Sequence, residues 1–154
     1  CYAGLAFGDL TSGLLSQRLK SRKKVLYIYW ALSAFSTALY FTLQGIELQA
    51  FYYLCAFVGF TVGSWVVFMT AAAEQFGTNI RATVSTSVPN FVRGAVVPMT
   101  GLFAYLKMNL PNWGIGGTIE AAIITGVIVL AVAVWAITGL RETYGEDLNY
   151  MEQL

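Results

Sequence analysis

Residues 48–73, LQAFYYLCAFVGFTVGSWVVFMTAAA, hold no charged side chain. A helix needs about 20 mainly apolar residues to cross the hydrocarbon core of a bilayer, so this run predicts a membrane span. Residues 25–46 before it are also uncharged, and residues 118–140 near the other end carry one charge, Glu120. These three runs predict three spans.

Two further segments are less clear candidates for membrane spans. Residues 83–107 are mostly apolar but carry Arg93 in the middle, and residues 1–16 are apolar and rich in Gly and Ser, broken only by Asp9. We interpret residues 1–16 as the end of another helix. The sequence therefore predicts an all-α integral membrane protein with about five transmembrane helices.

Composition agrees with a membrane protein and excludes several functions. Hydrophobic residues make up 57% of the chain, charged residues 11%, and the mean hydropathy is +0.64, whereas about a quarter of residues are charged in soluble domains. The net charge of +1 and the lack of a basic stretch interleaved with aromatics argue against nucleic acid as a partner. Without histidine or any catalytic or phosphate-binding motif, we expect no enzyme, no metal site and no cofactor.

Basic residues predict the orientation, because cytoplasmic loops carry an excess of Lys and Arg. Only Lys107 falls on the side opposite to the others. The basic residues of the first loop, the third loop and the tail are Arg18, Lys20, Arg22, Lys23, Lys24, Arg81 and Arg141. We therefore expect a multi-pass protein of the bilayer, in a cell inner or plasma membrane, whose C-terminal tail, residues 141–154, is cytoplasmic.

Polar residues inside a span are costly and are functional candidates by default. Thr86, Asn90 and Arg93 fall at i, i+4 and i+7 and share one helix face. Arg93 lies about 15 Å from the predicted cytoplasmic end of its span, near the bilayer middle. Two readings stay open: the stripe lines a cavity that favours an anionic substrate, or Arg93 pairs structurally with a carboxylate. Thr61 and Trp65 either face a substrate or serve packing.

Charges in the loops also have two readings. Glu74 and Arg81 stand at the cytoplasmic ends of adjacent helices, where a gating charge pair and a solvated loop pair look alike. Asp9 and the basic cluster of the first loop, taken alone, favour a simple positive-inside anchor.

Three short motifs give the chain a family resemblance. Residues 74–82, EQFGTNIRA, resemble the loop motif E-x-F-P-T-x-x-R-A of the major facilitator superfamily, in its sugar-porter and metabolite:proton symporter branches. Residues 141–145, RETYG, are similar to the P-E-T-K-G tail of sugar porters. The family's loop motif G-x-x-x-D-R-x-G-R-R/K is matched loosely by Asp9, Gly13, Arg18, Arg22 and Lys23.

The resemblance implies the last five helices of a twelve-helix fold. The chain opens at Cys1 without methionine, so we read it as part of a longer polypeptide whose N-terminal half lies elsewhere. In this family, cytoplasmic acid–base pairs hold the outward-open state, which makes Asp9, Glu74, Arg81 and the first-loop basic residues gate candidates. The coupling acid often sits in the N-terminal half.

The resemblance further implies a secondary active or facilitative transporter of a small polar metabolite, working by alternating access, with or without a coupling proton. Met69 stands where sugar porters commonly have tryptophan, so an organic acid fits as well as a sugar. The alternative is a non-transporting polytopic membrane module, receptor-like or an assembly subunit.

Overall fold

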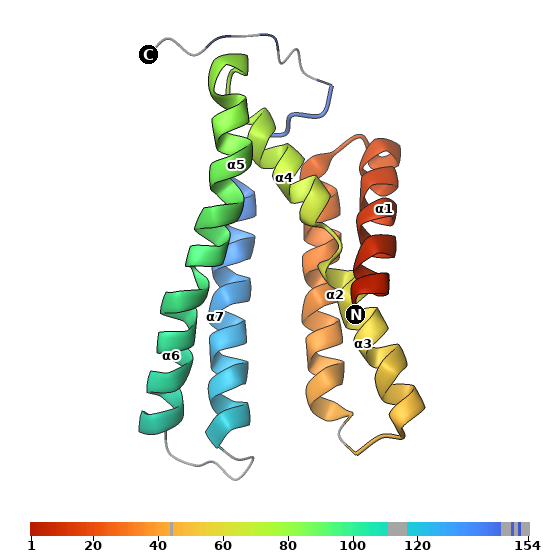
Figure 1. The fold of residues 1–154 in the computed structure, drawn as a ribbon, viewed down its shortest axis with the longest axis vertical. Coiled ribbons are helices and arrows are strands. Elements are labelled where there is room, and N and C mark those ends of the chain that lie inside the picture. The colour runs from red at the N-terminus through yellow and green to blue at the C-terminus, as the bar shows by residue number, and fades with distance from the viewer. Residues whose placement is uncertain (44, 111–116, 146–148, 150, 152–154) are drawn as a thin grey trace.

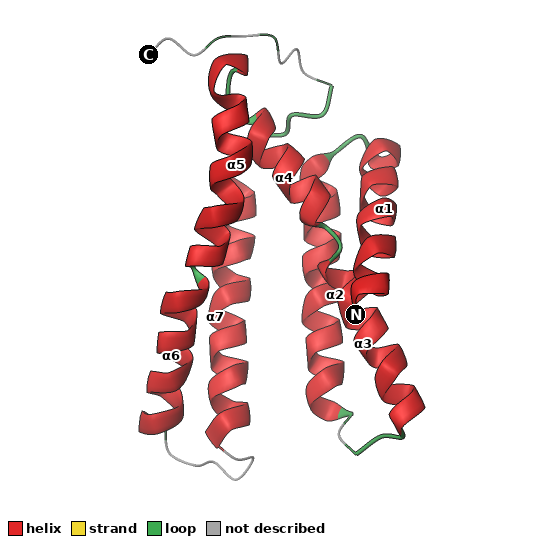
Figure 2. Ribbon diagram, in the orientation of Figure 1, coloured by secondary structure: helices red, strands yellow, loops and turns green. Residues whose placement is uncertain are grey.

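The computed structural model describes residues 1–43, 45–110, 117–145, 149 and 151. Within these residues all regular structure is helical, as Figure 2 shows, which confirms the predicted all-α class. The elements are α1 (Tyr2–Leu19), α2 (Arg22–Thr42), α3 (Leu48–Val62), α4 (Trp65–Glu74), α5 (Thr78–Gly94), α6 (Val96–Asn109) and α7 (Gly117–Gly139). In Figure 1, α3 and α4 form one interrupted rod, and α5 and α6 form another.

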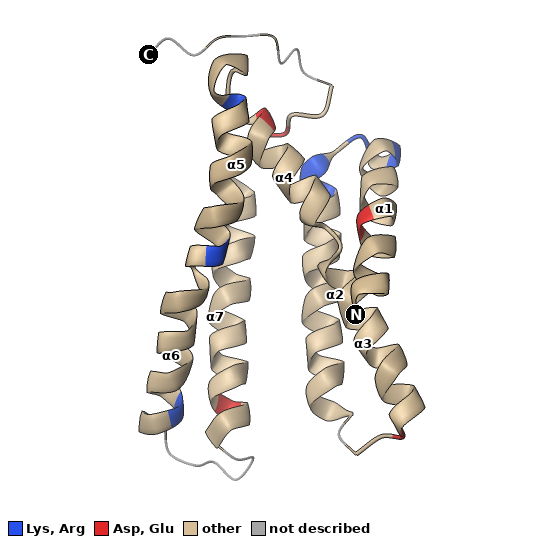
Figure 3. Ribbon diagram, viewed as in Figure 1, with Lys and Arg blue, Asp and Glu red and all other residues tan. Residues whose placement is uncertain are grey.

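The helices run between two ends of the molecule. At one end α1, α4 and α7 finish and α2 and α5 begin, whereas α2 connects to α3 and α6 to α7 at the other (Figure 1). The first end holds the basic residues of the first loop, together with Arg81 and Arg141, and is called the basic end below (Figure 3). Lys107 lies near the opposite end, at the finish of α6.

Three helical segments of the described chain are long and apolar enough to cross a membrane. They are Arg22–Thr42, Leu48–Glu74 and Gly117–Gly139, and they match three of the predicted spans. The other two predicted spans are not among them. α1 is less apolar because it carries Asp9, Gln17 and Arg18, and the segment predicted at residues 83–107 is divided into α5 and α6, of 17 and 14 residues. These findings fit an all-α membrane protein.

Each interrupted rod breaks at a short, identifiable position. The predicted span 48–73 is not one continuous helix, because it breaks at Gly63 and Ser64. The break between α5 and α6 falls at Ala95. Pro98 accounts for the second break, since it has no N–H to offer the carbonyl of Gly94 and its ring crowds that carbonyl.

The break in the first rod lies against α1. A Cβ on Gly63 would stand 2.4 Å from Gly8 Cα, and one on Gly8 would stand 2.2 Å from the carbonyl oxygen of Phe60. Gly4 and Gly59 make equally close approaches on the same two helices. The two backbones therefore touch, as small-xxx-small pairs allow in membrane helices.

The apolar core lies close to the basic end, where α2, α4 and α7 converge. Its buried members are Val25, Leu26, Tyr29, Val67, Ala71 and Ile137. Elsewhere large apolar side chains point outward; on α7 these include Val127, Val132 and Trp135. An apolar outer surface of this extent is what a lipid environment accommodates.

Candidate functional site

The first turn of α2 binds a carboxylate from the tail. The first three residues of α2 each have a free backbone N–H group, and that of Lys24 donates to the Ser21 hydroxyl at 3.2 Å. The other two donate to Glu142: Arg22 N to Oε1 at 2.8 Å and Lys23 N to Oε2 at 3.3 Å. Ser21 also donates its hydroxyl to Glu142 Oε2. A carboxylate there satisfies unpaired donors and faces the positive end of the helix dipole.

Hydrogen bonds from the helix end explain the titration of Glu142. Burial disfavours the charged form and would raise the pKa, but the bonds from Ser21, Arg22, Lys23 and Tyr144 outweigh it. The pKa of Glu142 is therefore lowered from its ordinary value of 4.5, and the group is ionised at neutral pH.

Arg22 carries an ion pair between α2 and α4. Its guanidinium donates to Glu74 through Nη2 at 3.0 Å and through Nε at 3.3 Å, the fork geometry that makes such pairs strong. Nη1 donates to the buried Ser16 hydroxyl at 2.9 Å, and Glu74 Oε2 accepts from Thr143 at 2.6 Å. With side chains 20% and 13% exposed, Arg22 and Glu74 are sheltered enough for this geometry to hold.

Further bonds fasten the tail and the end of α7 to the same place. Lys23 Nζ donates to the carbonyls of Thr138 and Leu140, at 3.1 and 2.9 Å, and so caps the C-terminus of α7. Gln75 exchanges hydrogen bonds with the backbone of Arg141. We call the set Ser16, Ser21, Arg22, Lys23, Glu74, Glu142 and Thr143 the charge cluster.

Of the predicted gate residues, Arg22, Lys23 and Glu74 come together in this cluster, while others lie apart. Arg18 is exposed in the last turn of α1. A Cβ on Gly13 would have no atom within 4 Å. Arg81 lies within α5, which begins five residues before the predicted span, and donates to the carbonyl of Phe76.

Asp9, which the sequence analysis grouped with the basic cluster of the first loop, lies within α1. α1 continues from Asp9 to Leu19, about 15 Å at about 1.5 Å per residue, so the carboxylate lies far from Arg22. Its Oδ1 instead accepts from the backbone N–H of Val66 at 3.3 Å, in the first turn of α4. The first predicted span thus extends past residue 16, and part of the predicted loop is helix.

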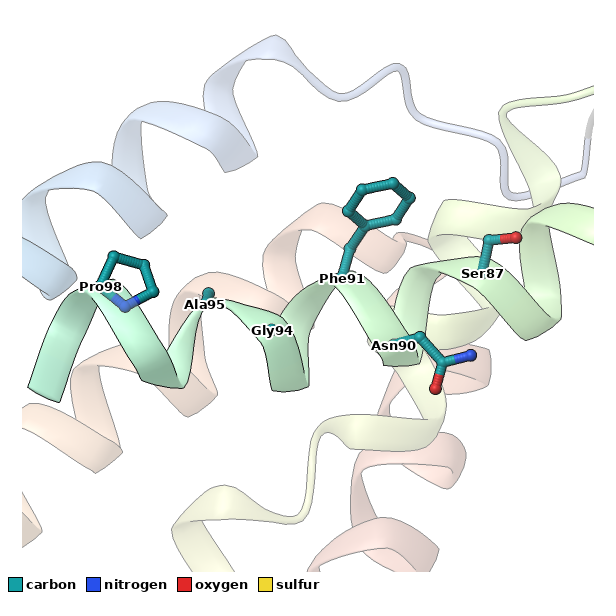
Figure 4. A pocket seen from close by; sticks show the side chains of 6 residues that line it. All are labelled: Ser87, Asn90, Phe91, Gly94, Ala95 and Pro98. Atoms are coloured by element: carbon teal, nitrogen blue, oxygen red, sulfur yellow. The ribbon is translucent and has the colours of Figure 1, made fainter.

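The predicted polar stripe lies on an open rod, because neither α5 nor α6 has a buried residue. A hollow of about 540 Å³ follows the break, lined by Ser87, Asn90, Phe91, Gly94, Ala95 and Pro98. Figure 4 shows Phe91 and Asn90 projecting from different sides of the rod. Thr86 and Arg93 are exposed but do not line the hollow. Among the described residues Arg93 has no ion-pair partner.

The last two predicted binding residues differ in exposure. Thr61 is 1% exposed and shares a 2.9 Å hydrogen bond with Ser36, so it packs between α3 and α2. Trp65 is 36% exposed, and its ring lies 5.7 Å from that of Phe68.

Sequence reasoning missed four members of the cluster, namely Ser16, Ser21, Glu142 and Thr143. A signal existed for two of them, because the tail resemblance includes Glu142 and Thr143. The two serines carry no family motif. Ser21 directly precedes Arg22 as the N-cap of α2, and only the fold brings Ser16 to the Arg22 guanidinium.

No protein-family model, curated protein or solved structure matches this chain.

Proposed function

We propose that the chain forms the last five spans of a major facilitator transporter, which moves a small polar metabolite, an organic acid or a sugar, by alternating access. In this proposal α1, α2, α3 with α4, α5 with α6, and α7 each cross the bilayer, and the basic end is cytoplasmic. The N-terminal half of the same protein supplies the other wall of the pathway. The charge cluster then belongs to the cytoplasmic gate.

One observation carries the proposal. The three segments that resemble family motifs are far apart in the sequence, yet each supplies partners to the charge cluster. Arg22 comes from the first motif, Glu74 from the second, and Glu142 and Thr143 from the third. Unrelated loop matches would have no reason to meet at one end of the fold, whereas parts of one gate would.

The end of α1 supports a different alignment of the motif G-x-x-x-D-R-x-G-R-R/K, which does not include Asp9. Lys20 adopts a left-handed conformation, φ 48°, directly after the helix, which is the position glycine favours. If Lys20 takes the place of the motif's second glycine, then Gly13, Arg18 and Arg22 match the pattern without a gap. In this register Gln17 replaces the motif's acid and Ser21 replaces the arginine after its second glycine, and Glu74 and Glu142 supply the carboxylates around Arg22.

The open rod of α5 and α6 supports the pathway side of the proposal. An arginine near the middle of a membrane helix costs about 2.5–3.5 kcal/mol on insertion scales unless it meets protein or water. Arg93 is exposed on a rod without a buried residue. A water-filled pathway along this rod would accommodate Arg93 and would favour an anionic solute.

The test is uptake by the full-length protein in liposomes, with radiolabelled monocarboxylates, dicarboxylates and hexoses as probes. For an anionic solute, Arg93→Ala should raise KM about 10–100-fold, because a charge-assisted hydrogen bond is worth about 1.5–3 kcal/mol. Lys107→Ala is the matched control, since Lys107 is an exposed cation on the same rod near the opposite end.

Glu74→Gln tests the gate. It removes the charge that binds Arg22, and we expect an inward-facing bias, measured as increased alkylation of cysteines placed on the cytoplasmic side of the pathway. Lys24→Gln, which removes an exposed charge two residues after Arg22, should leave alkylation unchanged. Uptake of no probe by the wild type, or unchanged behaviour in both Arg93→Ala and Glu74→Gln, would favour a non-transporting membrane module instead.

A further inference from the structure

Asp9 does not belong to the charge cluster. It lies about 15 Å from the basic end of α1, and α4, ten residues long, begins at the same depth. In a hydrocarbon core of about 30 Å this depth is near the middle. An acidic side chain there is costly when ionised and marks an ion or proton site by default.

The surroundings of Asp9 offer hydrogen bonds but no counter-charge. From α4 comes the N–H of Val66, and from α2 the Tyr29 hydroxyl, which donates to the carbonyl of Gly8 at 3.0 Å. The residues at the end of α3 that approach Gly8 and Asp9 are Phe60 and Gly63, neither of which ionises. Among the described residues no Lys or Arg pairs with Asp9.

A polar seam runs from Asp9 along α1 towards the charge cluster. Ser12 and Ser16 follow at one-turn intervals and are fully buried. Ser12 donates to the backbone carbonyl of Asp9 at 2.9 Å, and Ser16 accepts from Arg22. α1 therefore carries both the carboxylate at mid-depth and a hydrogen-bond partner of Arg22 near the basic end.

α4 makes the same connection on the other side of the seam. Its first turn donates to Asp9, and its last residue, Glu74, binds Arg22. Its start follows the break at Gly63 and Ser64, so it can move without distorting a continuous span. Because α4 has only ten residues, a displacement of its first turn is transmitted to Glu74, its last residue.

We propose that Asp9 is a proton-binding site and that α4 couples its protonation to the Arg22–Glu74 pair. The inference rests on the proposed transport function. When Asp9 is ionised, its carboxylate holds the first turn of α4. When a proton from water forms an O–H bond on Asp9, the charge is lost, the bond from Val66 weakens and α4 is freed at the break. Release of that proton to water on the other side restores the charge and the contact.

A solute-independent experiment tests proton binding. Infrared spectra of the full-length protein in lipid, recorded over a pH titration, should contain a protonated-carboxyl band that Asp9→Asn removes. Glu47→Gln, which changes an exposed acid at the start of α3, should keep that band. Asp9→Glu should retain a titrating band at a shifted pH and serves if Asp9→Asn fails to fold. An Asp9→Asn spectrum identical to the wild type overturns the proposal.

Coupling is tested separately by transport. For a probe that the wild type moves, a pH gradient of about one unit should drive about tenfold accumulation per coupled proton. Asp9→Asn should still exchange solute across the membrane but accumulate none. Undiminished accumulation by Asp9→Asn, or accumulation driven by sodium in place of protons, overturns the inference. Absence of transport by the wild type would instead count against the proposed function and leave the infrared result to judge Asp9.

Discussion

A single added methyl group on α1 should disrupt its contact with α3. In Gly8→Ala the new Cβ would stand 2.2 Å from the carbonyl oxygen of Phe60 and 2.9 Å from Gly63 Cα. Carbon atoms in ordinary contact are about 3.5–4.0 Å apart, so the two helices must separate by roughly 1 Å. Both obstructing atoms belong to backbone, which cannot rotate away as a side chain would.

The cost follows from that geometry. Overpacking a filled site costs about 1–3 kcal/mol, and the backbone contact places Gly8→Ala near the top of this range. Gly126→Ala is the control, because a Cβ on Gly126 of α7 has no atom within 4 Å. Replacing glycine by alanine within a helix stabilises by about 0.5–1 kcal/mol when nothing obstructs it. The two variants should therefore shift stability in opposite directions.

The assay is unfolding of the 154-residue chain from lipid–detergent micelles by added sodium dodecyl sulfate, followed by far-ultraviolet circular dichroism. Gly8→Ala should lower the unfolding midpoint and Gly126→Ala should leave it unchanged or raise it. Equal midpoints for the two variants would refute the close approach of α1 and α3.

Three further outcomes are expected. Because the pKa of Glu142 is lowered in the folded chain, its stabilisation is present above its ordinary value and is lost as pH falls below it; thermal unfolding of Glu142→Gln should lose that part of the pH dependence. Pro98→Ala restores a backbone donor to the Gly94 carbonyl, so the new amide at position 98 should be protected in hydrogen exchange. Lys23→Ala removes the cap of α7, and amides in the last turn of that helix should exchange faster, whereas Lys24→Ala should leave them unchanged.

Hydropathy was enough to predict three spans, because a long uncharged run has few other stable arrangements. The same run did not reveal the break at Gly63. Glycine is common in membrane helices, and Gly59 with Gly63 reads in sequence only as a packing pair. The break is placed by contact with Gly8, a residue far away in the chain, so no local pattern could locate it.

The sequence likewise predicted some residues of the candidate site and misplaced others. Arg22 and Glu74 were predicted from loop position, since charges crowd the end of a membrane helix bundle. Asp9 was misplaced because the motif was aligned on the first available acid, while the end of α1 depends on Lys20 adopting a left-handed conformation. Lysine is not a residue from which that conformation is expected. The sequence pattern therefore did not predict that α1 continues to Leu19.

The charge cluster contains one fixed part and one releasable part. Glu142 is held by the Ser21 hydroxyl and by the backbone N–H groups of Arg22 and Lys23, which stay in place as long as the first turn of α2 is intact. Glu74 depends on the Arg22 guanidinium, a flexible group that can swing away, and then retains only the bond from Thr143. Leaving a sheltered carboxylate underbonded costs about 1–3 kcal/mol, a barrier that is small enough to be crossed and large enough to bias two states. In the proposed gate, the Arg22–Glu74 pair is the part that would open, and Glu142 would keep the tail attached.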